Sequence, residues 1–156
     1  MKKKILVSIC VMLLFIMCVF NSDVKVNAQE LGENIDISYL LSESALVGYC
    51  DMQTRGIYLA DGYSIINKIS STKIGAGGGT DAAIRCKVSV TSIVERQTST
   101  GWARVTSWTQ TNENALSAML SKSLTVGTGY WYRVRSSHYA ATDASSSSTG
   151  ALWMGN

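Results

Sequence analysis

Tryptophan and arginine alternate along two segments of the chain, 102–109 (WARVTSWT) and 130–140 (YWYRVRSSHYA). Strand periodicity would place these side chains on one face of each segment, because alternate residues of a strand share a face. Indole rings stack on planar groups, and guanidinium groups donate hydrogen bonds beside them. The pattern therefore predicts a face that binds a sugar ring, a peptide or another planar ligand. The candidate binding residues are Trp102, Arg104, Trp108, Trp131, Arg133 and Arg135.

Two other interpretations of this face stay open. The arginine planes could stack on the indole rings as a structural ladder that binds nothing, or the tryptophans could simply belong to the core. The opposite face of the first segment holds only Ala103, Val105 and Ser107, which is thin for a core. A bulge in this strand could therefore turn Trp108 inward.

The single histidine, His138, has no recognisable catalytic partners. Ser137 and Asp143 are close in sequence, but adjacent strand residues point to opposite faces, so this proximity makes no relay. One histidine without clustered carboxylates or thiols is no metal site. The glycine-rich run 75–79 lacks the Gly-Lys-Ser/Thr ending of a phosphate-binding loop, which favours a connector. We therefore expect no enzymatic activity, no cofactor and no metal.

Residues 1–28 have the pattern of an export signal. Lysines precede an apolar run over 5–20, and the segment ends on the small residue Ala28. The apolar run is shorter than the ~20 residues that span a bilayer, which argues against an anchor. A lipoprotein would need a small residue before its cysteine, where this chain has Met17. The pattern predicts a secreted chain that begins at Gln29 and meets the membrane only through its leader during export.

The basic character of the chain belongs to this leader. The formal charge of +3 is accounted for by the leader's four lysines and one aspartate, so the mature chain is neutral. A neutral chain gives no argument for nucleic-acid binding. Residues 29–50 carry four acidic residues and no lysine or arginine, which favours a solvated acidic arm. The alternative is that this segment lies on the more basic remainder of the chain.

Removal of the leader leaves one pair of cysteines, Cys50 and Cys86. An oxidising compartment would allow a disulfide between them. In the chain-entropy model that bond would be worth roughly 4 kcal/mol. The alternative is two free thiols, with Cys86 packed as a small hydrophobic side chain on an inward phase.

Short alternating segments separated by Gly, Asn, Asp and Ser predict an all-β fold. The chain has no proline, so these residues must form the turns. Many short strands at even spacing favour a small antiparallel β-sandwich over residues 51–156. The expected turns and connectors are Asp61-Gly62, 73–81, 97–101, 111–114, 127–129 and 145–150, and the expected last strand is 151–154.

The segment LTVGTGY, followed by YRVR, resembles the tyrosine corner and penultimate strand of fibronectin type III and immunoglobulin-like domains. Leu124 and Tyr130 occupy matching positions, whereas the family usually has proline where this chain has Val126. The resemblance implies a structural role for both residues, with the Tyr130 hydroxyl bonded to backbone a few residues upstream. The segments YCDMQTRGIYLADG (49–62) and YWYRVRSSHYA are also similar to a family of short secreted Gram-positive bacterial proteins of unknown function.

These features together favour a secreted, non-catalytic binding or structural module. Its ligand would be extracellular, with glycan, cell wall and protein all open. A second hypothesis is a small secreted antimicrobial or toxin-like protein, because aromatic and arginine segments suit a membrane interface. The neutral mature charge argues against that second hypothesis. A third is a hydrolase that uses His138 as its base.

Overall fold

The computed structural model describes residues 33–35, 40, 44–51 and 56–155. The predicted signal peptide lies outside these residues. No helix in the described part of the chain combines the length and the apolar character needed to span a membrane.

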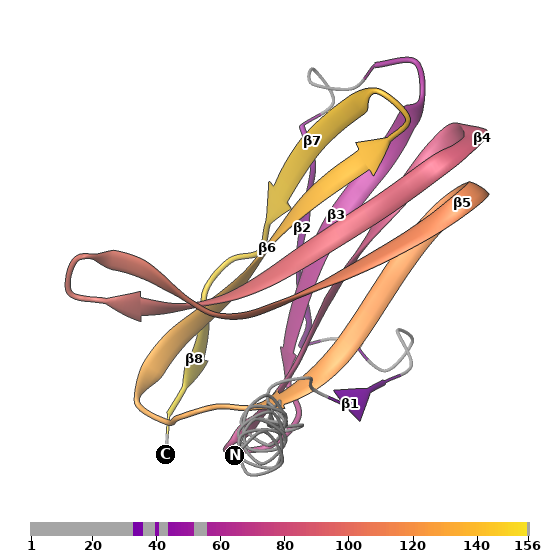
Figure 1. Ribbon diagram of the computed structural model, residues 1–156. Helices are drawn as coiled ribbons and strands as arrows, with labels where there is room; N and C mark the ends of the chain where they lie inside the picture. The colour runs from indigo at the N-terminus through magenta and orange to yellow at the C-terminus, as the bar shows by residue number, and fades with distance from the viewer. Residues whose placement is uncertain (1–32, 36–39, 41–43, 52–55, 156) are drawn as a thin grey trace, which may run out of the picture.

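Eight strands form one continuous antiparallel sheet (Figure 1). The predicted all-β class is therefore confirmed. The strands are β1 (Glu33–Asn34), β2 (Leu46–Tyr49), β3 (Leu59–Lys68), β4 (Lys73–Thr98), β5 (Gly101–Thr125), β6 (Tyr130–Ala140), β7 (Asp143–Ser148) and β8 (Leu152–Met154).

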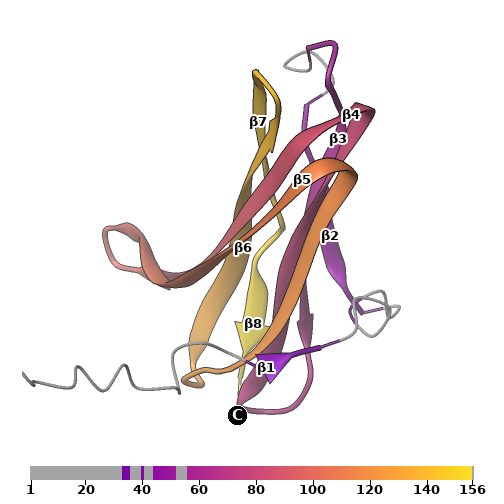
Figure 2. The ribbon, with the colours of Figure 1, turned by 45° about the vertical axis from the view of Figure 1, so that its right-hand side comes forward.

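The long β4–β5 hairpin is doubled over on itself. Both strands bend near 82–86 and 112–116, where the register shifts and Asn114 has a φ of 46°. Figures 1 and 2 show the two strands turning back at this bend. The halves on either side of the bend therefore lie in two layers that face each other. The first layer contains β1, β2, β3 and the halves 73–81 and 117–125, and the second contains β6, β7, β8 and the halves 88–98 and 101–112.

The glycine-rich segment 73–81 is the middle strand of the first layer, so its prediction as a connector is wrong. Gly78 faces the second layer, and a Cβ there would lie 2.7 Å from Ser136 Oγ and 2.9 Å from Ser92 Oγ. Two real carbon and oxygen atoms do not approach that closely, so the absent side chain sets the distance between the layers. Because glycine has no side chain, this segment also lacks the alternation of apolar and polar residues by which a strand is recognised in a sequence.

The described part of residues 29–50 is built into the fold, which corrects the predicted solvated arm. β2 pairs with β3, and β1 pairs with β5. Leu40 is 0 % exposed, and its Cδ2 would be 2.3 Å from a Cβ at Gly75. Gly75 thus leaves the space that Leu40 occupies, and the sheet begins well before the predicted boundary at residue 51.

The interior consists of two apolar clusters with polar side chains between the layers. One cluster includes Val94, Tyr132 and Met154, and the other includes Leu59, Val88 and Ala140. The predicted structural residue Leu124 lies in the first cluster. The buried polar residues that link the two layers are Ser64, Thr80, Ser92, Ser136, His138 and Ser147.

Four of these residues form a hydrogen-bonded chain, here named the hydroxyl–imidazole network: Ser64, Thr80, His138 and Ser147. His138 Nδ1 lies 2.9 Å from Thr80 Oγ1, and His138 Nε2 lies 2.8 Å from Ser147 Oγ. Ser147 Oγ in turn lies 2.6 Å from Ser64 Oγ. Because Thr80 donates its one hydroxyl hydrogen to a backbone carbonyl, His138 Nδ1–H must donate to Thr80. Nε2 of a neutral imidazole then accepts from the Ser147 hydroxyl. Burial between the layers favours this neutral form, because it lowers the pKa of His138.

The Asp61-Gly62 pair lies inside β3, so the predicted hairpin turn at this position is wrong. A register shift between Leu59 and Asp61 marks a bulge rather than a reversal of the chain. A Cβ at Gly62 would lie 2.5 Å from the His138 ring, so glycine is needed here for close approach of the imidazole. The Asp61-Gly62 pair looks like a turn in the local sequence, but the glycine is required by His138, which is 76 positions away along the chain.

The other expected turns divide into two groups. The turn before Gly101 and the connection through Gly129 are confirmed, and both glycines have positive φ. Segments 111–114 and 145–150 were predicted as turns or loops, but 111–114 lies within β5 and most of 145–150 lies within β7. The last strand was correctly placed.

We expect the free energy of unfolding to fall as the pH drops from about 6.5 to about 4. Burial lowers the pKa of His138 from 6.5 to about 4, and the Asp61 charge opposes part of that shift. Within this window the unfolded chain binds a proton that the native chain does not. The loss approaches about 3 kcal/mol at the acid end. Urea titrations across this range should show a steeper pH dependence for the native sequence than for His138→Gln; equal slopes would contradict the neutral network.

Gly78→Ala should destabilise the protein by about 2 kcal/mol or more, because its methyl group would overlap the Tyr63 carbonyl oxygen of the neighbouring strand and the Ser136 and Ser92 hydroxyls of the second layer. Gly127→Ala is the matched control, since its Cβ would meet only ordinary contacts of 3.7 Å. That variant should stay within about 0.5 kcal/mol of the native protein. Thermal and urea unfolding of the two variants would show the difference, and equal stability of both would count against close layer contact.

Candidate functional site

The outer face of the second layer carries the predicted aromatic and arginine side chains of β6. Along this strand Tyr132 and Val134 are buried, whereas Trp131 and Arg135 are exposed and Arg133 is half-buried. The phase predicted from the sequence is therefore correct. This surface, named the outer aromatic face, is defined by Glu95, Trp102, Trp131, Arg133, Arg135 and Trp153.

The neighbouring half of β5 contributes Trp102 and Arg104 to this side but not Trp108. Val94 pairs with Thr106 and Glu95 with Arg104, so Val105 is an extra residue in the strand. The bulge reverses the phase, and Trp108 is only 8 % exposed within the core. The open alternative of an inward-turned Trp108 is the one observed, and Trp108 is removed from the candidate face.

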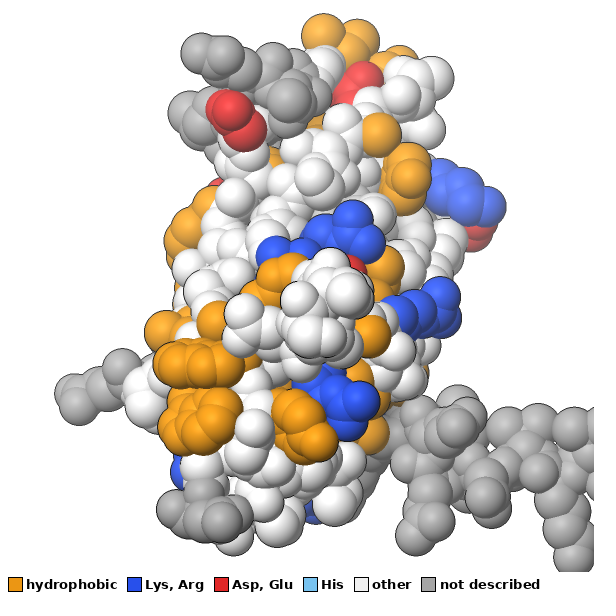
Figure 3. All heavy atoms as spheres, turned by 90° about the vertical axis from the view of Figure 1, so that its left-hand side faces the viewer, with side chains coloured by type: hydrophobic (Ala, Val, Ile, Leu, Met, Phe, Trp, Pro, Cys, Tyr) orange, Lys and Arg blue, Asp and Glu red, His pale blue; other side chains and the backbone are white. Residues whose placement is uncertain are grey.

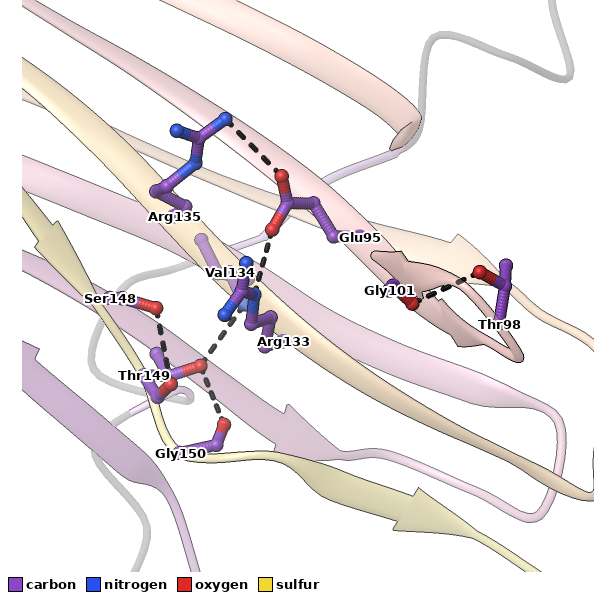
Figure 4. Close-up of polar contacts among 9 residues, drawn as sticks. All are labelled: Glu95, Thr98, Gly101, Arg133, Val134, Arg135, Ser148, Thr149 and Gly150. Atoms are coloured by element: carbon purple, nitrogen blue, oxygen red, sulfur yellow. Dashed lines mark hydrogen bonds and ion pairs between the residues drawn. The ribbon is translucent and has the colours of Figure 1, made fainter. Parts of the chain in front are cut away.

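Glu95 is the charged centre of the outer aromatic face, and sequence analysis missed it. It is 5 % exposed, and its two carboxylate oxygens accept from different arginines, as Figure 4 shows. Arg133 Nε lies 2.7 Å from Oε2, and Arg135 Nη2 lies 3.3 Å from Oε1. The Arg133 guanidinium also lies 4.3 Å from the centre of the Trp102 ring. Arg133 and Trp102 thus form the structural ladder that was one of the open interpretations.

Trp131 and Trp153 form a second unit on the same face. Their ring centres are 5.2 Å apart with an interplanar angle of 47°, and the two residues are 41 % and 46 % exposed. Their strands pair at this point, with Trp131 opposite Trp153. The sequence pattern predicts a final strand that includes Trp153 and no role for its side chain. The alternation in that strand, with Met154 buried, was the signal that could have found it.

Figure 3 shows the side of the molecule from which the end of the β4–β5 hairpin projects. Hydrophobic side chains and basic side chains lie next to one another on it. Arg104 donates to Ser107, and Arg96 lies 4.5 Å from the centre of the Tyr130 ring. Arg96 pairs in register with the buried Tyr132, so it belongs to the opposite side of the strand from Glu95. Two arginines, Arg133 and Arg135, therefore share the single carboxylate of Glu95, and Arg104 lies opposite it in the strand register. The local surplus of positive charge favours a ligand that presents oxygen acceptors.

The hydrogen bond that was predicted for the Tyr130 hydroxyl is made instead by Tyr132, two residues further along β6. Tyr132 is buried and donates to the Gly127 carbonyl oxygen at 3.0 Å. Tyr130 is exposed and lies beneath Arg96. The tyrosine-corner role of Tyr130 is therefore corrected: the two residues share the inward phase of β6, but Tyr130 lies at the exposed start of the strand, whereas Tyr132 lies within the core and makes the hydrogen bond.

A shallow hollow of about 410 Å³ lies at the opposite end of the second layer's outer side. Tyr139 and Ser137 of β6 line it, together with residues 144–146 of β7. Tyr139 is exposed like Trp131, yet it has no second aromatic ring within the contacts found for the described residues. The two ends of this side therefore offer distinct surfaces.

The remaining reactive groups are used inside the fold. His138 is 0 % exposed, and both ring nitrogens are bonded to hydroxyls. Asp143 accepts from the backbone amides of Tyr58 and Leu59, at 2.6 and 3.0 Å. Among the described residues, no group of three or more His, Cys, Asp or Glu side chains could hold a metal ion. Cys50 and Cys86 are free thiols, which is the second of the two alternatives that the sequence left open.

Glu95→Gln should lower the free energy of unfolding by about 1 to 3 kcal/mol, because it removes the charge that two arginines share in a buried position. Glu113→Gln is the matched control, since its ion pair with Lys87 is exposed. We expect that variant to change stability by less than about 1 kcal/mol. Urea unfolding at low and high salt measures both, and equal losses would show that Glu95 does not hold the face together.

Comparison with known proteins identifies a family for this chain, but the family has no known activity. Residues 40–152 match the family described as Family of unknown function (DUF6147), a match that spans β2 to the start of β8. No curated protein and no solved structure matches the chain. The resemblance to fibronectin type III domains is not confirmed by any of these findings. The chain belongs to the Family of unknown function (DUF6147), in agreement with the expected membership of a family without known function.

Proposed function

We propose that the protein is a non-catalytic extracellular binding module whose outer aromatic face recognises a glycan. The single observation that carries this proposal is the exposed Trp131–Trp153 pair. Two indole rings expose apolar surface at the same point, within a face that also carries guanidinium donors. Sugar rings present apolar C–H faces and hydroxyl oxygens, which match both kinds of group.

The exposure of this pair is unusual for the residue type. Tryptophan is highly buried on average, and an exposed aromatic cluster costs solubility and favours association. Nothing in the described fold uses the outer surfaces of these two rings. Pairing of β6 with β8 only requires their backbones. A ligand that covers the rings supplies a reason for two large apolar side chains at this position.

The arginines around the pair have different roles in the proposal. Arg133 is held by Glu95 and Trp102, so its geometry is fixed before any ligand arrives. The Arg135 side chain is 52 % exposed and makes one contact with Glu95. Its remaining guanidinium N–H groups can therefore donate hydrogen bonds to a ligand. Fixed side chains lose little conformational entropy on binding. The face thus combines a rigid support with a free hydrogen-bonding group.

A non-catalytic role is supported by the position of the histidine. A general base must reach the proton it removes, directly or through one water molecule. His138 is sealed between the layers with both nitrogens engaged, so no substrate has access to it in this conformation. Export, which residues 1–28 predict, would bring the aromatic face to cell-surface polymers.

Trp131→Ala/Trp153→Ala should lose retention on insoluble bacterial cell wall and polysaccharides that the native protein binds. Loss of two stacking rings is expected to weaken affinity by tenfold or more. Sedimentation of the purified protein with each polymer measures the bound fraction. Circular dichroism and thermal unfolding of the variant verify that it is folded.

Tyr139→Ala is the matched control, because it removes an exposed aromatic ring from the same strand at the far end of the layer. It should bind like the native protein. Equal loss in both variants would move the site to the hollow at Tyr139. Equal retention of the native protein and the double variant on every polymer, or no retention of either, would overturn the glycan proposal.

A further inference from the structure

A second cavity opens where the two halves of β5 separate, at the edge between the layers. Its volume is about 410 Å³, and it lies on the interior side of the second layer, away from the outer aromatic face. One wall comes from Trp108 and Gln110 in the second layer. The other comes from Leu120 and Lys122 in the first layer, with Asn34 of β1 beside them.

Trp108 brings an unused hydrogen-bond donor to this cavity. The residue is more than nine-tenths buried, and its Nε1–H has no hydrogen-bond partner among the residues that the structure describes. A buried donor without an acceptor costs about 1 to 3 kcal/mol, so such groups are rare and commonly mark a ligand or an unseen water. Trp108 is itself one of the residues that line the cavity. An acceptor oxygen in the cavity is therefore the partner that this group lacks.

Lys122 brings an unpaired positive charge to the opposite wall. Its position alternates with Ser121 and Ser123, in the same phase as the inward-facing residues Leu120 and Leu124. It is half-buried and makes no ion pair with any described residue. None of the described residues that line the cavity is acidic. A cation directed between two layers without a counter-charge favours an anionic ligand.

We infer that this cavity binds a small organic carboxylate. The carboxylate oxygens accept from the Trp108 Nε1–H and face the Lys122 ammonium group, while the apolar body of the ligand lies against Leu120 and the indole ring. The Nε1 atom is hidden from solvent, so the wall must yield slightly to admit an oxygen. The long side chain of Lys122 can move to allow it.

The test uses benzoate and benzamide as matched probes that differ in charge. Each is titrated into ¹⁵N-labelled protein at constant ionic strength, and nuclear magnetic resonance spectra follow the Trp108 indole N–H and the amides of 108–110 and 119–122. Benzoate should shift these signals saturably, with millimolar affinity for so small a ligand. Benzamide should bind at least fivefold more weakly.

Three variants assign the contacts. Lys122→Gln should weaken benzoate binding at least fivefold and remove the preference over benzamide, whereas Lys87→Gln, which removes an exposed lysine elsewhere, should leave both unchanged. Trp108→Phe should weaken benzoate binding about threefold or more while the ring volume is largely kept. If that variant does not fold, Lys122→Gln alone decides the result.

Several outcomes would overturn the inference. One is the absence of any shift at 20 mM benzoate, and another is equal shifts from both probes. A third is shifts confined to the signals of Trp131 and Arg135, which would place benzoate on the outer aromatic face. Because the glycan experiment removes Trp131 and Trp153 and this one removes Lys122, either proposal can fail while the other holds.

Discussion

Close contact between the two layers along the glycine-rich half of β4 is the constraint on which the structure depends. Packed sheets usually stand about 10 Å apart, with large side chains interleaved between them. Here Gly78 meets the hydroxyls of Ser92 and Ser136 directly. Hydroxyls in that space must be paired because water cannot reach them. The same approach brings Thr80 within reach of His138, so the small residues and the buried polar chain are two results of one geometry.

This interior arrangement also fixes the exterior of β6. His138 is held by partners on two other strands, Thr80 on β4 and Ser147 on β7. A strand whose even-numbered residues are locked inward must present its odd-numbered residues outward. A slip of one residue would bury Arg133 and Arg135 and expose the imidazole. The buried network thus protects the register that displays the outer aromatic face, although it touches no ligand itself.

The sequence predicts this fold best where side chains alternate and worst where the cause is distant. The strand phase of β6 and the turn at Gly101 follow from local pattern, and both are correct. Gly62 and the glycines of 75–79 carry the local signal of turns and connectors. Their actual causes are a histidine ring and a facing layer, which no nearby residue announces. A glycine in the sequence indicates that another group packs closely against the backbone, but it does not identify that group.

In the candidate site, too, some residues follow from the local sequence pattern and others depend on distant strand pairing. Trp131, Arg133 and Arg135 follow from periodicity alone, whereas Glu95 becomes their partner only through the pairing of β4 with β6, 38 residues away. Once Glu95 is placed, Arg133 and Trp102 are accounted for by the fold, and Trp108 is accounted for by the bulge at Val105. Within the two candidate sites, the described fold gives no reason for the exposed outer surfaces of Trp131 and Trp153 or for the charge of Lys122. A fold retains large apolar rings in water and a cation between its layers at a cost in stability. These residues are therefore the places where recognition, rather than folding, gives the better physical account of the sequence.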